Sequence, residues 1–434
     1  MAHTSSTSTT PSTAVTSTNP SRGLINTNGE MLKNGHLPIF CPRQGANRGK
    51  ITTLVAVMSK RVVIAPDSFK GSLSAVEVGE ALGEGIRSVL PDCRVEMVPI
   101  ADGGEGSAEI ITHAMGGKMM STEAHDPLGR TITAHYGILP NKVAVIDVAS
   151  AAGLTLLSEG EKDPLRASSC GVGELIADTL SNGCTGLILG LGGSATNDCG
   201  VGMLSTLGYR FLDSHGEEVF PSGGNLYFIE RIDPTHALPQ LRHTPITLAV
   251  DVRAPFCGEG GAARVFAPQK GATPSVVERL DEGMAHFAEI MERHCGVDIR
   301  NLAGAGAAGG IGGTLHALLG ATIRSGAEVV LESVGFEERI AGCDLVVTGE
   351  GCIDHQTLLG KAPSEVLGRA AGCGVRCVAV GGSVRLCPEL EQSAFADIVT
   401  ATPKGMPLEQ ALQPEVAKRN LHLAGRKIAK KWLG

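Results

Sequence analysis

The sequence has few aromatic residues, no excess of positive charge and no long hydrophobic run. Aromatic residues make up 3% of the 434 residues, so any core is built mainly from Val, Leu, Ile and Ala. The formal net charge of −8 argues against non-specific nucleic-acid binding, which requires a basic surface. No apolar run approaches the roughly 18–20 residues that a membrane span needs. We therefore expect neither a nucleic-acid partner nor a membrane partner.

Several motifs of well-known enzyme classes are also missing. The 12 cysteines include no CxxC pair, and the 13 histidines show no metal-site spacing. Scattered cysteines of this kind are typical of a reduced, cytoplasmic protein. The GxxxxGK[ST] loop, the protein-kinase catalytic motifs, the GxSxG elbow and the HExxH pair are absent. These absences argue against the enzyme classes that depend on those motifs.

Glycine, by contrast, is abundant, with 58 residues. From Arg61 onward, apolar strands alternate with polar glycine loops and helices: RVVIAPD precedes SFKGSLSA, and RVEMVP precedes ADGGEG. Ser74 and Glu77 have the spacing of a capping box, and a later strand is predicted over Ile246–Val252. This alternation is typical of a parallel α/β sheet, in which ligands bind at the carboxyl ends of the strands.

The stretch 190–202, GLGGSATNDCGVG, follows an apolar run and precedes a predicted helix. Ser194, Thr196 and Asn197 offer hydrogen-bond donors beside the Asp198 carboxylate. The stretch fits a capped tight turn or, because a helix start has unpaired N–H groups, an anion site. Similar loops elsewhere favour the anion site; their charged residues are Asp67, Lys70, Asp102, Glu105, Lys270, Glu350 and Asp354.

Loops of this composition suit phosphoryl transfer. In that reaction backbone N–H groups and lysines hold phosphates, carboxylates hold Mg²⁺, and one Asp orients or deprotonates the attacking hydroxyl. A nicotinamide-dependent oxidoreductase is an alternative, because Gly304, Gly306 and Gly309 match the GxGxxG fingerprint. That fingerprint normally follows a strand, and the preceding VDIRNLA has no continuous apolar run.

Seven motifs, in order from about Lys60 to the C-terminus, resemble the bacterial-type glycerate kinase family. They are IAPDSFKGSLSA (64–75), PIADGGEGS (99–107), DPLGR (126–130), LGGSATNDCGVGML (191–204), FAPQKGA (266–272), GAGAAGGIGG (304–313) and TGEGCIDHQTLLGKAP (348–363). The resemblance implies an ATP- and Mg²⁺-dependent glycerate 2-kinase, which transfers the γ-phosphoryl group to D-glycerate and releases 2-phosphoglycerate and ADP. The chain departs from the family pattern at Cys352, Ala267 and Ala254, so a catalytically weakened metabolite-binding relative is a second alternative.

The resemblance also implies two α/β domains with the active site between them. A flavodoxin-like parallel-sheet domain, formed by both chain ends, is expected over 58–120 and 300–434, and an inserted mixed-sheet domain over 121–299. We expect a monomer or homodimer. Residues 1–57 are rich in Ser and Thr and are predicted to be a disordered extension. They resemble an organellar transit peptide weakly, and a start codon upstream of Met58 explains them more simply.

Each candidate site residue receives a predicted role. Asp198 is expected to accept the proton of the glycerate hydroxyl, with Asp102 as its rival, and Lys70 to neutralise the substrate carboxylate or a phosphate. Hard cations favour grouped carboxylates, so the Mg²⁺ ligands are predicted to be Asp102, Glu105, Glu350 and Asp354. The residues predicted to bind substrate or phosphate are Asp67, Ser68, Ser72, Gly103, Gly104, Gly192, Gly193, Ser194, Thr196, Asn197, Lys270, Gly306, Gly309 and Gly349.

Overall fold

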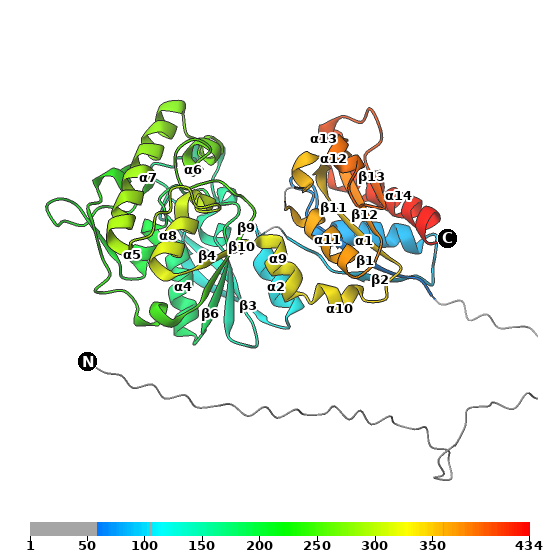
Figure 1. Cartoon of the computed structure of the whole chain (residues 1–434), viewed down its shortest axis with the longest axis horizontal. Coiled ribbons are helices and arrows are strands. Elements are labelled where there is room, and N and C mark those ends of the chain that lie inside the picture. Colours follow the sequence, from blue (N-terminus) through cyan, green and yellow to red (C-terminus); the bar gives the residue numbers. More distant parts are fainter. Residues whose placement is uncertain (1–58, 102, 105, 359) are drawn as a thin grey trace, which may run out of the picture. The chain divides into compact units, whose positions relative to one another are not determined.

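The computed structural model describes residues 59–434 except Asp102, Glu105 and Leu359. The predicted extension over residues 1–57 lies outside the described residues. Two large sheets with helices on their faces organise the described chain, which confirms the predicted α/β class (Figure 1). Among the described residues, no helix combines the length and the apolar character that a membrane span requires.

The first sheet is built from both ends of the chain, and all its strands run parallel. Its strands are β1 (Arg61–Pro66), β2 (Arg94–Met97), β11 (Leu345–Ile353), β12 (Cys377–Val384) and β13 (Asp397–Thr400). Their spatial order is β2-β1-β11-β12-β13. Numbered within this sheet alone, that order is 2-1-3-4-5, the order of flavodoxin-like folds. The predicted flavodoxin-like sheet is confirmed.

The second sheet is mixed, as predicted. Its strands are β3 (Lys118–His125), β4 (Thr131–Ile138), β5 (Val143–Asp147), β6 (Gly186–Gly190), β9 (Ile246–Val250) and β10 (Thr322–Ser325). They follow the order β10-β9-β6-β5-β4-β3, with parallel pairing from β10 to β5 and antiparallel pairing from β5 to β3. A separate antiparallel pair joins β7 (Arg210–Leu212) to β8 (Arg231–Asp233). β10 lies beyond residue 299, and the predicted domain boundaries themselves stay a prediction.

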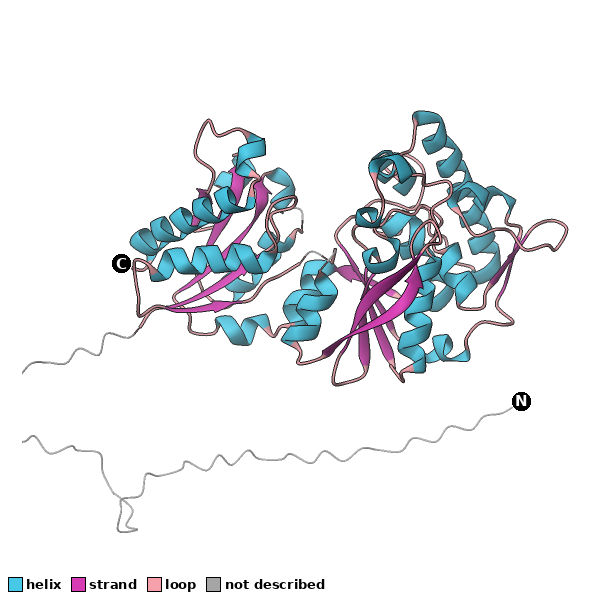
Figure 2. Cartoon of the chain, turned by 180° about the vertical axis from the view of Figure 1, so that it is seen from behind, coloured by secondary structure: helices cyan, strands magenta, loops and turns pink. Residues whose placement is uncertain are grey.

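Helices lie on both sides of the sheets (Figure 2). The α-helices are α1 (Ala75–Arg87), α2 (Ser107–Ala114), α3 (Ala149–Ala152), α4 (Cys170–Ser181), α5 (Val201–Thr206), α6 (Ala262–Phe266), α7 (Pro274–Cys295), α8 (Ile311–Leu319), α9 (Gly326–Ser333), α10 (Phe336–Ile340), α11 (Ala362–Gly372), α12 (Pro388–Glu391), α13 (Leu408–Ala411) and α14 (Pro414–Trp432). Short 3-10 helices are η1 (Leu154–Leu156), η2 (Glu159–Glu161), η3 (Gly223–Phe228), η4 (Pro239–His243), η5 (Pro268–Lys270), η6 (Ala307–Gly310) and η7 (His355–Leu358). The predicted capping box is confirmed at the start of α1, between Ser74 and Glu77.

Strand β1 shows why the first sheet is buried on both faces. Val62 and Ile64 pack in one apolar cluster with residues of α1 and α14, while Val63 and Ala65 pack in another with residues of α11. A parallel sheet covered by helices on both faces needs strands of this uninterrupted apolar kind. Helices α1 and α14, from opposite ends of the described chain, lie side by side (Figure 1). A Cβ atom at Gly85 of α1 would lie 2.1 Å from the His422 carbonyl oxygen, so glycine permits this close approach.

Candidate active site

A cavity of about 1300 Å³ is lined by the carboxyl ends of strands from both sheets. Asp67 follows β1, Val98 follows β2, Leu191 follows β6 and Asp251 follows β9, and each of them lines the cavity. Parallel α/β sheets bind ligands at these strand ends, particularly where the strand order reverses, as it does between β1 and β11. We therefore take this cavity as the candidate active site.

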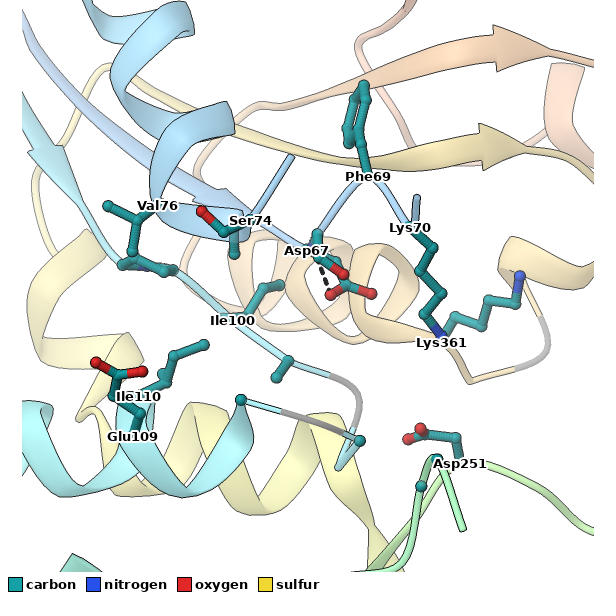
Figure 3. A pocket seen from close by; sticks show the side chains of 18 of the residues that line it. Asp67, Phe69, Lys70, Ser74, Val76, Ile100, Glu109, Ile110, Asp251 and Lys361 are labelled. Carbon is teal, nitrogen blue, oxygen red and sulfur yellow. Dashed lines mark hydrogen bonds between the residues drawn. The ribbon is translucent and has the colours of Figure 1, made fainter. Parts of the chain in front are cut away.

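Charged side chains of both signs line this cavity. Figure 3 draws Asp67, Lys70, Asp251 and Lys361 among its lining residues. The Ser68 N–H donates a hydrogen bond to Asp67 Oδ1 at 2.6 Å. Together these side chains offer lysine charges for anionic groups and carboxylate oxygens for a hard cation.

Lys361 is held in place by Glu350, a buried carboxylate of β11. Lys361 Nζ lies 3.2 Å from Glu350 Oε2, and the Thr357 hydroxyl donates to Glu350 Oε1 at 2.7 Å. Both carboxylate oxygens therefore already have a partner. This geometry favours Glu350 as a residue that positions Lys361, in place of the predicted role as a direct Mg²⁺ ligand.

Lys270 contributes a buried amine to the cavity wall. The residue is only 2% exposed, and its Nζ donates hydrogen bonds to Ser194 Oγ at 3.0 Å and to the Thr196 carbonyl at 2.6 Å. Burial lowers the pKa of Lys270 to about 7, although the nearby Asp198 raises it. An arriving anion favours the protonated amine. Lys270 can therefore become fully charged when a phosphate or carboxylate binds.

Asp198 lies outside the cavity lining and is fully buried. Its carboxylate accepts hydrogen bonds from the Ser169 N–H and hydroxyl, both at 2.8 Å, and from the N–H groups of Gly200 and Gly202 at 3.1 and 3.3 Å. Burial raises the pKa of the Asp198 carboxyl, against the effect of these hydrogen bonds. The geometry argues against the predicted role of Asp198 as proton acceptor. It favours a structural role, in which Asp198 ties the turn 190–202 to the start of α4.

The structure brings part of the predicted site together. The predicted residues that line the cavity are Asp67, Ser68, Lys70, Ser72, Gly104, Gly192, Gly193, Ser194 and Lys270. The described residues that do not line it are Gly103, Thr196, Asn197, Asp198, Gly306, Gly309, Gly349, Glu350 and Asp354. Asp102 and Glu105 lie outside the described residues.

Several residues away from the lining have packing tasks. Thr196 and Asn197 are fully buried, and Asn197 Nδ2 lies 3.1 Å from Met284 Sδ. A Cβ atom at Gly349 would lie 2.2 Å from the Val380 carbonyl oxygen of the neighbouring strand. Asp354 Oδ1 accepts a hydrogen bond from the Gln356 N–H at 2.9 Å within the turn after β11. The contacts of Gly349 and Asp354 explain these two residue types without a ligand, whereas Thr196 Oγ1 and Asn197 Oδ1 are buried without a hydrogen-bond partner.

The glycines of 304–313 also serve close packing. A Cβ atom at Gly306 would lie 2.3 Å from the Pro255 carbonyl oxygen, and one at Gly309 would lie 2.2 Å from that of Thr196. The residues 296–303 contain no strand, which the dinucleotide fingerprint requires. The neighbouring Ala307 and Ala308 line the cavity. The geometry therefore favours a tightly packed turn in the cavity wall over a nicotinamide site.

A pair of glycine substitutions tests this interpretation. Gly309 (φ +66°) and Gly320 (φ +65°) share a left-handed backbone, but a Cβ atom at Gly320 meets nothing within 4 Å. Gly320→Ala is expected to cost about 1–2 kcal/mol of the free energy of unfolding. Gly309→Ala is expected to cost about 3–5 kcal/mol, since the Thr196 backbone must also move. Urea denaturation measures both variants, and equal losses would contradict the packing interpretation.

Sequence reasoning missed seven polar residues of the lining: Ser74, Glu109, His113, Asp251, Gln269, Arg339 and Lys361. The predicted strand over Ile246–Val252 enclosed Asp251, whereas β9 ends at Val250 and leaves Asp251 in the loop. Lys361 belongs to the quoted motif 348–363 but stands eleven residues after Glu350, on the far side of a turn. A prediction that ended this strand at Val250 would have placed Asp251 in the loop that follows it.

The three departures from the family pattern lie outside the cavity lining. The Ala267 carbonyl accepts the Lys270 N–H at 3.0 Å, and the Ala254 carbonyl accepts the Gly306 N–H at 3.1 Å. Both contacts use the backbone, which any residue supplies. Cys352 Sγ lies 3.8 Å from Asp354 Oδ2 and is half-buried.

Comparison with known proteins agrees with this fold and motif order. The model of the glycerate kinase family matches residues 62–433. A glycerate kinase of Halalkalibacterium halodurans is 41% identical over 83% of this chain and 97% of its own length. The glycerate 2-kinase of Escherichia coli K12 is 42% identical over 75% of this chain and 85% of its own length.

A solved structure is similar in both sequence and fold. The crystal structure of a Salmonella typhimurium LT2 protein assigned as glycerate kinase 2 has a TM-score of 0.74 and 39% sequence identity. It covers 86% of this chain and 98% of that one. Family match, relatives and fold agree over most of the described region, and the chain belongs to the glycerate kinase family.

Proposed function

We propose that this chain is an ATP-dependent glycerate 2-kinase, which transfers the γ-phosphoryl group of ATP to the 2-hydroxyl of D-glycerate and releases 2-phosphoglycerate and ADP. The observation that supports this proposal is the charge pattern of the cavity. Lys70, Lys270 and Lys361 line it together with Asp67 and Asp251. ATP and glycerate are both anions, and phosphoryl transfer depends mainly on positioning and on neutralising phosphate charge.

The donor set of the cavity fits Mg²⁺. Hard cations prefer carboxylate oxygens, and Asp67 and Asp251 both line the cavity. We propose these two as ligands, beside the predicted Asp102 and Glu105. Glu350 and Asp354 do not line the cavity. An Mg²⁺ ion held there would neutralise the negative charge that develops on the phosphate during transfer.

The cavity residues have different roles in this reaction. Lys270, fixed by Ser194 and the Thr196 carbonyl, holds an anionic oxygen as a preorganised cation. Lys70 and Lys361 hold the remaining phosphate and carboxylate charge. The proton of the glycerate hydroxyl passes to a cavity-lining carboxylate that does not ligate Mg²⁺. Asp67 or Asp251 meets the first condition, and Asp198 does not line the cavity.

An assay of ADP release tests the proposal. D-glycerate with Mg-ATP is expected to give ADP, and removal of Mg²⁺ by a chelator is expected to abolish turnover. Enolase added as the coupling enzyme consumes 2-phosphoglycerate directly, so its signal reports which hydroxyl was phosphorylated. ADP without an enolase signal would overturn the 2-kinase assignment alone. Glycerate binding by folded protein without ADP formation would favour the metabolite-binding alternative.

Two further expectations accompany the proposed function. The eleven cysteines of residues 59–434 carry free thiols, which supports a reducing compartment such as the cytoplasm. Light scattering after size-exclusion chromatography distinguishes the proposed monomer from the proposed homodimer.

A further inference from the structure

Away from the cavity, three side chains of different chemistry converge on one point. They are the imidazole of His355, the thiol of Cys387 and the carboxylate of Glu389, and one ligand atom from each lies within 4.8 Å of the other two. Among the described residues this is the one group of three or more His, Cys, Asp or Glu side chains with such spacing. We infer that these three residues form a Zn²⁺ site.

The fold brings the three residues together from two segments. His355 begins η7, after β11, while Cys387 immediately precedes α12 and Glu389 stands in its first turn. The ends of β11 and β12 are paired, with Ile353 opposite Val384, and the Arg385 N–H donates to the Ile353 carbonyl at 2.8 Å. His355 lies two residues after Ile353, and Cys387 lies three residues after Val384. The pairing of Ile353 with Val384 therefore brings the two segments together.

Apolar packing below the three side chains holds both segments. Ile353, Ala379 and Leu390 form a small buried cluster, and Leu358 of η7 and Cys387 pack against it. The imidazole and the carboxylate are exposed and the thiol is half-buried, so an ion can reach them from solvent. The packing therefore fixes the backbone segments that carry the three ligands.

The donor types select the ion. In a tetrahedral Zn²⁺ site the ligand atoms lie about 3.5 Å apart, so atoms within 4.8 Å of one another need to approach by at most about 1.3 Å. A thiolate and an imidazole favour Zn²⁺ and similar borderline ions, whereas Mg²⁺ prefers oxygen ligands alone. On binding, the Cys387 thiol releases its proton to solvent, His355 binds as the neutral imidazole, and a water fills the fourth position. The site does not depend on the proposed kinase reaction, and it would join η7 to α12.

Cobalt titration of the chelator-treated full chain tests the inference. Co²⁺ bound to a thiolate gives a charge-transfer absorption band, so the wild type is expected to show this band at one equivalent of Co²⁺. Zn²⁺ is expected to remove the band by competition, and a large excess of Mg²⁺ is not. Cys387→Ser is expected to abolish the band, and His355→Gln and Glu389→Gln to weaken Co²⁺ binding at least tenfold.

Matched controls keep this test decisive. Ser is a favoured residue before a helix, so Cys387→Ser is expected to fold, as circular dichroism checks. Cys373→Ser removes an exposed thiol outside the group and is expected to leave the band unchanged. Absence of a band in the wild type, a band that survives Cys387→Ser, or a band that disappears in Cys373→Ser would each overturn the inference.

Discussion

Replacing Asp198 by Ala is expected to lower the free energy of unfolding by about 3–5 kcal/mol, because several buried donors lose their acceptor and each unsatisfied donor costs about 1–3 kcal/mol. The substitution leaves the Ser169 N–H and hydroxyl and the Gly200 and Gly202 N–H groups without their shared acceptor. The turn 190–202 then loses its tie to α4. Urea denaturation of the two proteins measures the loss.

This experiment separates two roles for the same carboxylate. Removal of a catalytic base lowers kcat strongly and changes stability little. Removal of a structural carboxylate lowers stability strongly. Asp213 provides the control, because it also accepts two backbone N–H groups in a turn but is accessible to solvent. Asp213→Ala is expected to destabilise much less. Unchanged stability of Asp198→Ala together with a lost kcat would restore the original prediction.

Replacing Lys270 by Met is expected to lower kcat/KM by about 10²–10³-fold, the usual effect of removing one preorganised donor to a charged oxygen. Met preserves the length of the side chain and the burial, but it cannot donate to an anion. Lys430→Met, which removes an exposed lysine of α14, is the control and is expected to retain activity. Near-normal kcat/KM in Lys270→Met would exclude Lys270 from anion binding.

The same substitution has an effect on stability that depends on pH. Burial lowers the pKa of Lys270 from 10.5 to about 7 in the folded protein. Between these two values the unfolded chain binds one more proton at this residue, so this lysine makes stability rise with pH. The loss of stability caused by burying Lys270 is largest below pH 7 and is absent above pH 10.5.

The difference between wild type and Lys270→Met isolates this effect from other titrating groups. Without bound ligand, that difference is expected to change by up to about 1.4 kcal/mol per pH unit from pH 7 upward. Urea midpoints at pH 7.5, 8.5 and 9.5 give the slope. A flat difference would show that the folded protein keeps Lys270 fully charged.

The local sequence by itself determined the elements of this protein. Apolar runs such as RVVIAP, the Ser74–Glu77 capping box and glycine loops act over a few residues, so they predicted the strands and helices and the α/β class. The order of long, specific motifs determined the glycerate kinase family. Hydrophobic periodicity and helix capping can be read from the sequence because they depend on neighbouring residues.

Only the tertiary structure decided which side chains face the cavity. Asp198 and Lys270 both stand in polar loops, but only Lys270 lines the cavity. Partners distant in sequence fix the two side chains: Ser169 donates to Asp198, and Lys270 donates to Ser194. The pairing of β1 with β11 likewise joins residues more than 280 positions apart. Burial and pairing across such separations depend on the whole packed chain, and no local pattern specifies them.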